Sequence, residues 1–323
     1  MSQTLVKRIT CDGEPLEMAL MIDCAYIETI NLDGAMLILH FNDEAAYIRD
    51  DGGVKAGSIL EVEFDDLVNE SFTESFEVMM TPATKDNAIE INCIQKHVAI
   101  AKKPAQQPIF FVDKSISDIV QVLLPEAGGY EIDSFAGVFT YHLNTGNSPS
   151  KLLRKIAKDL GACIYMNRGI VYMKKMKAID ETSPTITLEY KNPSAEKQMT
   201  DISPFDVSKL YARKLGKAHF SWSMTQGLIS DESAQGAPVF TPSRTQAQLK
   251  NLPFSFLPVM NFSTFGDLNI LPSKKLELIF HRAQTENVID ESLPDIATVT
   301  RTTHFQIGLN YLCEVEVSLY EQY

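Results

Sequence analysis

Short runs in which apolar and polar residues alternate strictly recur along this chain, and they constrain its fold more than any other feature. The run Ile59–Asp65 puts three apolar side chains on one face of an extended strand and three carboxylates on the other. The run Cys313–Leu319 alternates in the same way near the other end of the sequence. A period of two is typical of strands with one buried face, so the chain is predicted to be mainly β.

The first hundred residues predict a small β-barrel or sandwich. Strand-like runs at Met36–Phe41, Phe76–Met79 and Ile89–Ile94 accompany the run at 59–65, and turn-forming residues separate them. Short strands at this spacing, with glycines between them, are typical of a small closed or sandwiched β unit. We therefore place a first acidic β-barrel domain at residues 1–105.

Two helices are expected between residues 106 and 180. Ser115 caps the first one, which carries an apolar stripe. Ser148 is the N-cap of the second, Pro149 takes its first position and Gly161 closes it. The run Ala162–Met173 follows with the pattern of a β-hairpin. Residues 106–180 are therefore predicted to form an α+β domain with two helices.

Strand-like runs return after residue 180 and predict a second β-barrel domain at 181–323. The clearest are Leu276–Phe280 and Ala297–Phe305. Residues 223–252 are rich in Ser, Gln, Thr, Gly and Pro and lack periodicity, so a long inserted loop is expected there. The predicted fold class is mainly β with an α+β middle, in which two small β-barrel-like domains flank a helix-containing domain.

The net charge of −13 lies entirely in the first third of the chain. Residues 1–100 contain 19 acidic residues and 6 basic ones, whereas residues 101–323 contain 23 of each. Duplex DNA is densely negative, and proteins that hold it tightly do so with Lys and Arg. A tightly wrapped DNA complex is therefore disfavoured. An acidic surface that DNA passes without binding is compatible with this distribution.

The segment from Lys151 to Lys177 has the opposite character, with eight basic residues against one acidic residue. One interpretation is a solvated helix face followed by a polar hairpin. The other is a contact surface for an acidic partner, such as the acidic N-terminal region of a neighbouring chain. The candidate contact residues, all on the second predicted helix, are Lys151, Arg154, Lys155 and Lys158.

The sequence carries no recognisable catalytic or metal-binding motif. The six histidines include no pair at the spacing of a helical metal site, and the five cysteines form no CxxC pair. A G-x-S-x-G elbow, a P-loop and a Rossmann glycine motif are all missing from the sequence. His304 could be argued as a base, but a structural histidine is the favoured interpretation. We expect no catalytic residue, no metal site, no cofactor and reduced cysteines.

No stretch approaches the roughly 20 consecutive apolar residues that span a bilayer. The first twelve residues also lack the apolar core of a secretory signal. We expect a protein that is made in a cytoplasm and has no membrane span.

The order of these parts, together with three motifs, resembles a known family. The motifs are S-P-S-x-L-L-x-x-I-A-x-D-L-G-A at 148–162, the pattern Asp43…Gly57…Val62, and L-P-x-x-x-L-x-L at 271–278 leading to a V-T-x-x-x-H strand that ends at His304. The chain thus resembles the central baseplate hub of contractile-tailed phages, a family that includes the late control protein D group and the hub half of type VI secretion spike proteins.

The resemblance implies a homotrimer in which two similar barrels per chain make a pseudo-six-fold ring. Such a ring would adapt a six-fold tail tube, or its initiator protein, to a three-fold central spike, with other baseplate proteins around it. The chain shows no β-helical needle repeat, so the needle would be a separate protein. The expected location is the virion, in the tail baseplate, after synthesis in the bacterial host cytoplasm.

The resemblance also implies a channel through which DNA passes without specific binding. Glu61, Glu63 and Asp65 are the candidates for lining it, because they share one face of one strand and carboxylates repel phosphates. The alternative for these three residues is an outward, solvated strand face.

Two other functions remain open from the sequence. A tail-associated cell-wall hydrolase would need an acid–base pair in a cleft, and no motif supports it. A β-rich adhesin or carbohydrate-binding protein would expose aromatic residues, for which Trp222 and the phenylalanines of 253–265 are the candidates. The basic amphipathic helix is unusual for an adhesin, so a non-enzymatic structural hub is the favoured interpretation.

Overall fold

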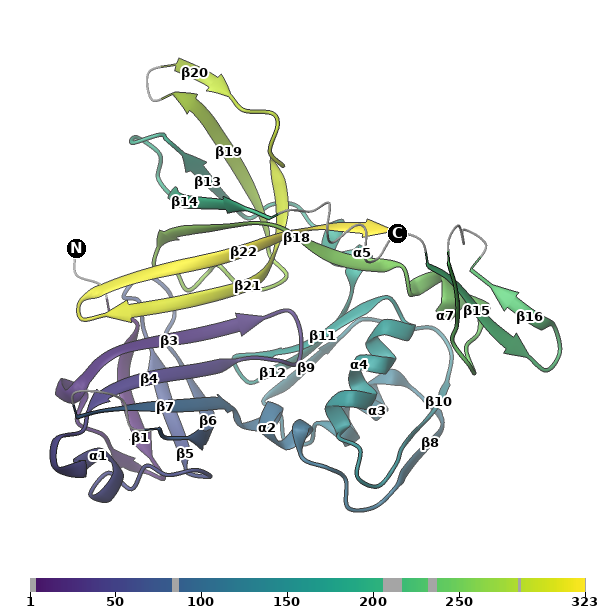
Figure 1. Ribbon diagram of the computed structural model, residues 1–323, viewed down its shortest axis with the longest axis horizontal. Helices are drawn as coiled ribbons and strands as arrows, with labels where there is room; N and C mark the ends of the chain where they lie inside the picture. The colour runs from purple at the N-terminus through teal and green to yellow at the C-terminus, as the bar shows by residue number, and fades with distance from the viewer. Residues whose placement is uncertain (1–3, 83–86, 206–216, 232–236, 284–285, 323) are drawn as a thin grey trace.

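The computed structural model describes residues 4–82, 87–205, 217–231, 237–283 and 286–322 (Figure 1). The N-terminal strands, in purple and blue, lie beside the long C-terminal hairpin, in yellow. The helical middle of the chain, in teal, lies next to the N-terminal strands, and a small green sheet projects at the far right of the view.

The first β unit is built from antiparallel strands in the order β1-β5-β6-β7-β4-β3. The alternation predicted over 59–65 is confirmed, since Leu60, Val62 and Phe64 are fully buried. The elements are β1 (Val6–Cys11), β2 (Glu14–Pro15), η1 (Met18–Leu20), β3 (Met21–Thr29), β4 (Met36–Asn42), η2 (Glu44–Ala46), α1 (Tyr47–Asp50), β5 (Ile59–Phe64), β6 (Phe72–Met80) and β7 (Ala88–Gln95).

The second β unit is a closed six-stranded barrel in the order β21-β22-β18-β14-β13-β19, with β19 returning to β21. Strand β13 pairs in parallel with both β14 and β19, and the other pairings in the barrel are antiparallel. Closure leaves these six strands without an open sheet edge. The strands are β13 (Ile186–Tyr190), β14 (Gln198–Pro204), β18 (Phe254–Phe265), β19 (Lys275–Ala283), β21 (Ile296–Ile307) and β22 (Asn310–Gln322), and β20 (Glu286–Ile289) extends β19.

The two β units are joined through β3 and β21, which pair in antiparallel register. One continuous apolar core therefore runs through both units, from Ile9 and Phe64 to Phe262 and Val315. At the open side of the first unit, the side-chain oxygen of Gln306 accepts the backbone N–H groups at the start of β1, at 2.8 and 2.9 Å. A side chain on β21 thus satisfies donors that a further strand would otherwise take.

The middle of the chain has its own apolar core, separate from that of the β units. Both predicted helices are present, with Ser115 and Ser148 as their N-caps, and the predicted hairpin is formed by β11 and β12. The elements are α2 (Lys96–Lys102), β8 (Ile109–Lys114), α3 (Ile116–Leu123), β9 (Gly129–Ile132), β10 (Phe139–Leu143), α4 (Pro149–Asp159), β11 (Ala162–Asn167), β12 (Ile170–Lys175) and α5 (Met176–Asp180).

The region expected as a long inserted loop, 223–252, is structured where it is described, so that expectation needs correction. It contains β16 (Gly227–Ser230), β17 (Ala237–Phe240) and α7 (Gln246–Asn251), and both strands pair with β15 (Lys217–Ser223). Four-residue strands are too short to show a period, which is why the sequence pattern indicated a loop. The domain boundaries at 105/106 and 180/181 stay a prediction.

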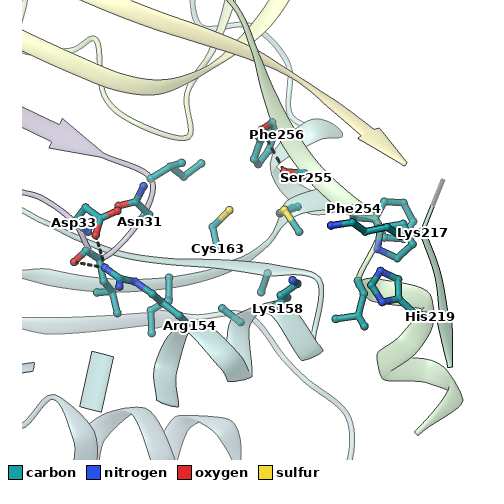
Figure 2. Close-up of a pocket in the computed structure, with 18 residues that line it drawn as sticks. Asn31, Asp33, Arg154, Lys158, Cys163, Lys217, His219, Phe254, Ser255 and Phe256 are labelled. Carbon is teal, nitrogen blue, oxygen red and sulfur yellow. Dashed lines mark hydrogen bonds and ion pairs between the residues drawn. The ribbon is translucent and has the colours of Figure 1, made fainter. Parts of the chain in front are cut away.

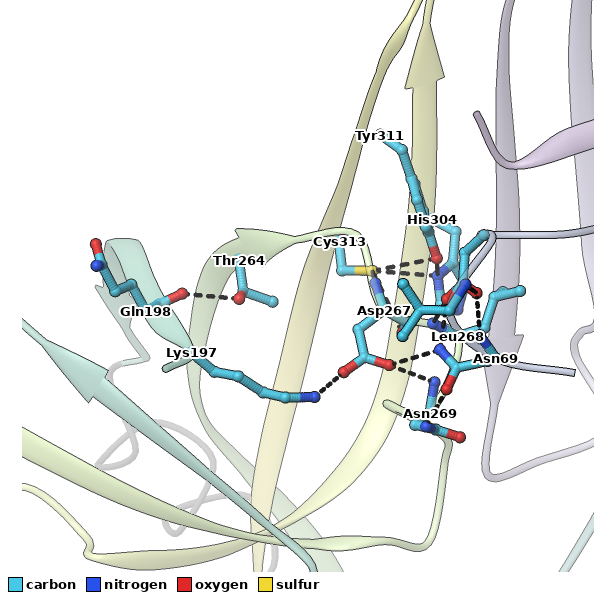
Figure 3. A network of polar contacts seen from close by, with 12 residues as sticks. Asn69, Lys197, Gln198, Thr264, Asp267, Leu268, Asn269, His304, Tyr311 and Cys313 are labelled. Carbon is cyan, nitrogen blue, oxygen red and sulfur yellow. Dashed lines mark hydrogen bonds and ion pairs between the residues drawn. The ribbon is translucent and has the colours of Figure 1, made fainter. Parts of the chain in front are cut away.

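Two loops far apart in sequence are held together beside the core (Figure 3). Asp66 is buried and accepts the backbone N–H groups of Val68, Asn69 and Leu268, at 2.7 to 3.1 Å. Asp267 accepts a hydrogen bond from the side-chain amide of Asn69 at 3.2 Å, and its other carboxylate oxygen pairs with Lys197. Burial alone would raise the pKa of Asp66, but the N–H donors of Leu268 and Asn69 outweigh it and lower that pKa.

Asp66→Asn tests this connection between the two β units. The amide has one acceptor oxygen and no charge, so we expect unfolding free energy at pH 7 to fall by about 2–3 kcal/mol. Because the folded pKa of Asp66 is depressed, its contribution is present above the ordinary aspartate range and is lost as pH falls through the folded pKa. Urea denaturation of Asp66→Asn and of the neighbouring control Asp65→Asn measures this. Equal losses in the two variants would contradict the assignment.

Candidate functional site

Of the three carboxylates proposed for a channel, Glu61 and Glu63 lie on the outward face of β5, opposite the buried face, and Asp65 directly follows the strand. Glu61 is exposed, whereas Glu63 and Asp65 are half-buried by basic residues of β1. Lys7 Nζ lies 2.8 Å from Glu63 and 3.5 Å from Asp65, and Arg8 Nε lies 3.5 Å from Glu63. The face is therefore acidic but partly neutralised. Its assignment to a channel stays a prediction.

The basic residues of α4 point in several directions. Arg154 reaches the loop after β3, where it pairs with Asp33 and donates to the backbone oxygen of Leu32 (Figure 2). Lys155 lies over the ring of Tyr141 at 5.8 Å from its centroid. One member of the basic set thus contacts the acidic N-terminal region of its own chain. The role of Lys151, Arg154, Lys155 and Lys158 toward a partner stays a prediction.

Beside Arg154 lies a groove of about 590 Å³ between α4, β11, β15 and the start of β18 (Figure 2). Its basic rim includes Lys158, Lys217 and His219, and its apolar part includes Phe254 and Phe256. Burial and the surrounding cations lower the pKa of His219, although Asp231 opposes them. A neutral imidazole there leaves the lysines as the main charges of the rim.

A cluster of buried ionisable groups occupies the junction of β3 and β21. His304 Nε2 lies 3.1 Å from Glu28, and its Nδ1 lies 2.7 Å from the Tyr311 hydroxyl and 3.2 Å from Cys313 Sγ. A thiol, an imidazole and a carboxylate in this order are the components of a nucleophilic triad. Here all three are fully shielded from solvent, so a substrate cannot reach the sulfur. The interpretation of His304 as a structural histidine agrees with this burial.

Burial and charge act against each other in this cluster. Burial alone would lower the pKa of His304, but Cys313 and Glu28 outweigh it and raise that pKa to about 10. Burial alone would raise the pKa of Glu28, but the hydrogen bond from His304 and the nearby Arg168 lower it. Imidazolium and carboxylate therefore form a buried ion pair at neutral pH.

A second carboxyl group completes the cluster and behaves differently. The Tyr26 hydroxyl lies 2.7 Å from Glu74 and 3.0 Å from Glu28, yet it has one proton to donate. Burial raises the pKa of Glu74 to about 7, and the Glu28 charge adds to this, although the Tyr26 hydroxyl opposes it. A protonated Glu74 can donate to Tyr26, which then donates to the ionised Glu28.

The tip of the β11–β12 hairpin enters the same junction. Arg168 lies over the ring of Phe72 at 4.2 Å from the centroid, and its Nε is 3.6 Å from Glu28. Its guanidinium also donates to the backbone oxygen of Leu268 at 2.5 Å. One arginine from the middle of the chain therefore contacts both β units and fixes where the middle lies.

Sequence reasoning missed this cluster, although a signal was present. Glu74 lies between Phe72 and Phe76 on the core-facing side of β6, and Glu28 follows Tyr26 on the core-facing side of β3. A carboxylate at an inward position of an alternating strand must be paired or protonated. The alternation of these two strands is therefore sufficient to single out both carboxylates.

The aromatic residues considered for an adhesin are dispersed. Phe262 is buried and Phe254 and Phe256 are half-buried, whereas Phe265 is exposed. Trp222 is 59% exposed on the projecting sheet, on another element. In the described part of the chain these side chains do not form one aromatic groove.

Within the described residues, helices long and apolar enough to cross a membrane are not found. Groups of three or more His, Cys, Asp or Glu side chains placed to hold a metal ion are likewise not found in those ranges.

Comparisons with known proteins find similar solved structures but no matching sequence family. No family model matches this sequence, and no curated protein matches it. A tail protein from Neisseria meningitidis is similar in structure, with a TM-score of 0.67 and 9% identity over 98% of this chain and 96% of that one. The 43 kDa tail protein of prophage MuSo2 from Shewanella oneidensis gives a TM-score of 0.63 and 13% identity over 98% of each chain.

A third similar structure comes from a secretion system. It is an Escherichia coli component of the type VI secretion system, described as structurally similar to two tail proteins of bacteriophage T4. The TM-score is 0.56 at 8% identity, over 98% of this chain and 79% of that one. The fold implied by the sequence resemblance, that of phage tail proteins and type VI secretion components, is confirmed.

Glu74→Gln tests the protonation of the buried cluster. A carboxyl group with a raised folded pKa binds its proton more tightly when folded, so stability falls as pH rises from about 4.5 to about 7. The glutamine side chain does not ionise, so Glu74→Gln does not undergo this fall in stability. We expect Glu74→Gln to be more stable than the unchanged protein at pH 8, by on the order of 2 kcal/mol, with a smaller difference at pH 5.

Urea denaturation at pH 5, 6, 7 and 8 provides the measurement. Glu70→Gln is the matched control, because Glu70 is exposed on the loop before β6. A difference between Glu74→Gln and the unchanged protein that does not vary with pH would show that Glu74 is ionised throughout.

Proposed function

We propose that this chain is the structural hub of a phage-like contractile tail baseplate. Three copies would form a ring that adapts a six-fold tail tube to a three-fold central spike and surrounds a channel for DNA. The observation that carries the proposal is a fold shared with two tail proteins over 98% of this chain. On this proposal the protein acts in the virion without catalysis, after synthesis in the host cytoplasm.

The architecture supports a pseudo-six-fold ring. Each chain has two six-stranded β units, β1-β5-β6-β7-β4-β3 and the closed barrel, joined by one strand pairing. Three copies would therefore present six β units around an axis. The shared core and the buried junction between them would keep the two units of each copy in one orientation.

Exposed apolar side chains support contacts with other proteins. Phe110, Val112 and Val138 are each more than 60% exposed around the two-stranded β8–β10 sheet. Ile307 and Leu309 are both 62% exposed at the turn of the β21–β22 hairpin. Contiguous patches of exposed apolar side chains often mark interaction sites, whereas single exposed apolar residues are common and need no such explanation. Neighbouring copies, the spike, the tube and the surrounding baseplate proteins are the partners we assign to these surfaces.

The oligomeric state tests the ring directly. Light scattering followed by negative-stain imaging should show a three-fold ring with a central opening wide enough for duplex DNA. The protein is first measured alone and then mixed with candidate spike and tube proteins from the same source. A chain that stays monomeric in every mixture would sink the proposal.

The channel hypothesis has a separate test in the assembled ring. The triple variant Glu61→Gln/Glu63→Gln/Asp65→Asn removes three negative charges per copy from the face of β5. Because carboxylates repel phosphates, we expect duplex DNA to bind this ring at low salt, with binding lost as salt rises.

The matched control removes the same number of charges elsewhere. Glu44, Asp50 and Asp51 are exposed around α1, and Glu44→Gln/Asp50→Asn/Asp51→Asn leaves the β5 face unchanged. Gel-shift assays at roughly 20 to 200 mM salt compare the two rings. Equal DNA binding by both, or by neither, would place the β5 carboxylates away from the DNA path.

A further inference from the structure

The groove of about 590 Å³ beside α4 has mostly apolar walls and extends from the loop after β3 to β15 (Figure 2). Its volume falls within the range of ligand sites, which is roughly 300–1,000 Å³. The apolar lining comes from α4, β11 and the start of β18, and it includes Ala157, Cys163, Phe254 and Phe256. An occupant with an apolar side would therefore lose contact with water against these walls. The hub proposal assigns no partner to this groove.

The charged side chains in the lining leave an excess of positive charge. Asp33 is the single carboxylate among the lining residues that the structure describes, and it is paired with Arg154. Lys158 and Lys217 also line the groove, and both are exposed. Neither lysine pairs with a carboxylate in the described part of the chain. Two ammonium groups are thus available to an anionic occupant.

These two lysines approach the groove from different elements. Lys158 lies on α4 and Lys217 on β15, and His219 lies beside them (Figure 2). Burial lowers the pKa of His219, and the two ammonium groups add to this effect, although the Asp231 carboxylate opposes it. Asp231 is buried and accepts the backbone N–H of His219 at 3.2 Å, so it does not line the groove. A carboxylate in the groove would meet both lysines and no unpaired negative charge.

The walls of the groove are held in place by contacts outside it. Phe254 stacks on Tyr320 with ring centroids 5.4 Å apart and an angle of 12° between the planes. Asn251, at the end of α7, donates to the backbone oxygen of Asp159 at 2.9 Å, which ties α7 to α4. Arg154 ties the other end of the groove to the loop after β3. The groove therefore needs little ordering to accept an occupant.

The combination of apolar walls and two unpaired lysines favours one kind of occupant. An inorganic anion would leave the apolar walls uncovered. A nucleic acid carries a phosphate on every nucleotide, and two lysines are few for a protein that holds one. An extended peptide that has acidic side chains beside aromatic or large aliphatic ones supplies both kinds of contact along one chain.

We propose that this groove binds an extended acidic segment of another protein. Carboxylates of the segment pair with Lys158 and Lys217, and a large apolar side chain packs against Phe254 and Phe256. The proposal follows from the groove alone and does not rest on the hub proposal.

Lys158→Glu/Lys217→Glu tests the charged contacts. Both side chains are exposed and without ion pairs in the described part of the chain, so we expect an unchanged melting temperature. Binding of an acidic peptide should fall at least tenfold, because like charges would then face each other. The matched control is Lys151→Glu/Lys155→Glu, which changes the charge equally on exposed positions of α4 that do not line the groove. This control should keep its binding within about twofold.

Binding is measured by fluorescence anisotropy on the full chain, with a labelled peptide in which aspartate and phenylalanine alternate. One comparison peptide has asparagine in place of aspartate, and another has alanine in place of phenylalanine. Each should bind at least tenfold more weakly, because the first lacks the charge and the second lacks the apolar side chain. Laurate and single-stranded oligothymidine compete with the labelled peptide as probes of the other ligand classes.

Saturable peptide binding that is lost in Lys158→Glu/Lys217→Glu and kept in the control variant supports the proposal. It is overturned by the absence of saturable binding, by equal losses in the two variants, or by tighter binding of laurate or oligothymidine. Self-association that Lys158→Glu/Lys217→Glu alone abolishes would make a second copy the occupant and overturn it too.

The peptide measurement needs no ring assembly. A failure here therefore leaves the hub proposal standing, and a monomeric chain that binds the peptide leaves this one standing.

Discussion

The pairing of β3 with β21 is the contact on which the rest of the structure depends. Seven residue pairs, from Arg301 opposite Thr29 to Ile307 opposite Asp23, join strands that are separated by most of the chain. Glu28 and His304 lie on the core-facing side of this junction and pair across it. Side chains alternate along a strand, so a slip of one residue would place one charge in the core and the other outside it. The ion pair therefore specifies the register in which the two β units meet.

The Glu28–His304 ion pair contributes more to the register of β3 against β21 than to the free energy of unfolding. A buried ion pair recovers little more than the cost of removing both charges from water, whereas leaving one charge without its partner is strongly unfavourable. Alternative alignments of β3 and β21 are penalised for this reason. Arg168 orients the middle of the chain in the same way, because its guanidinium lies beside Glu28 and donates to the backbone oxygen of Leu268. Three parts of the chain thus meet at one polar junction, and each is oriented by the other two.

Much of the local structure could be predicted from the sequence, because it depends on local patterns. Alternation identified β5, and N-cap residues located α3 and α4 together with the hairpin that follows. The parallel pairing of β13 with β19 and the closure of the barrel through β21 depend on contacts between distant segments, which a periodicity cannot specify. The strands of 223–252 were missed because they are four residues long. The buried junction could have been found, since Glu74 interrupts an inward apolar face.

The acidic charge of the first hundred residues does several different things in the folded chain. Three of the acidic side chains are buried and hydrogen-bonded or ion-paired inside the protein, namely Glu28, Glu74 and Asp66. On the surface, Lys7 partly neutralises Glu63 and Asp65. The formal charge of −13 therefore overstates the negative potential that this region presents at its surface. At physiological salt, charges act over about 8 Å. If the proposed ring forms, the charge that DNA would meet is therefore set by the few carboxylates within that distance of the duplex in each copy.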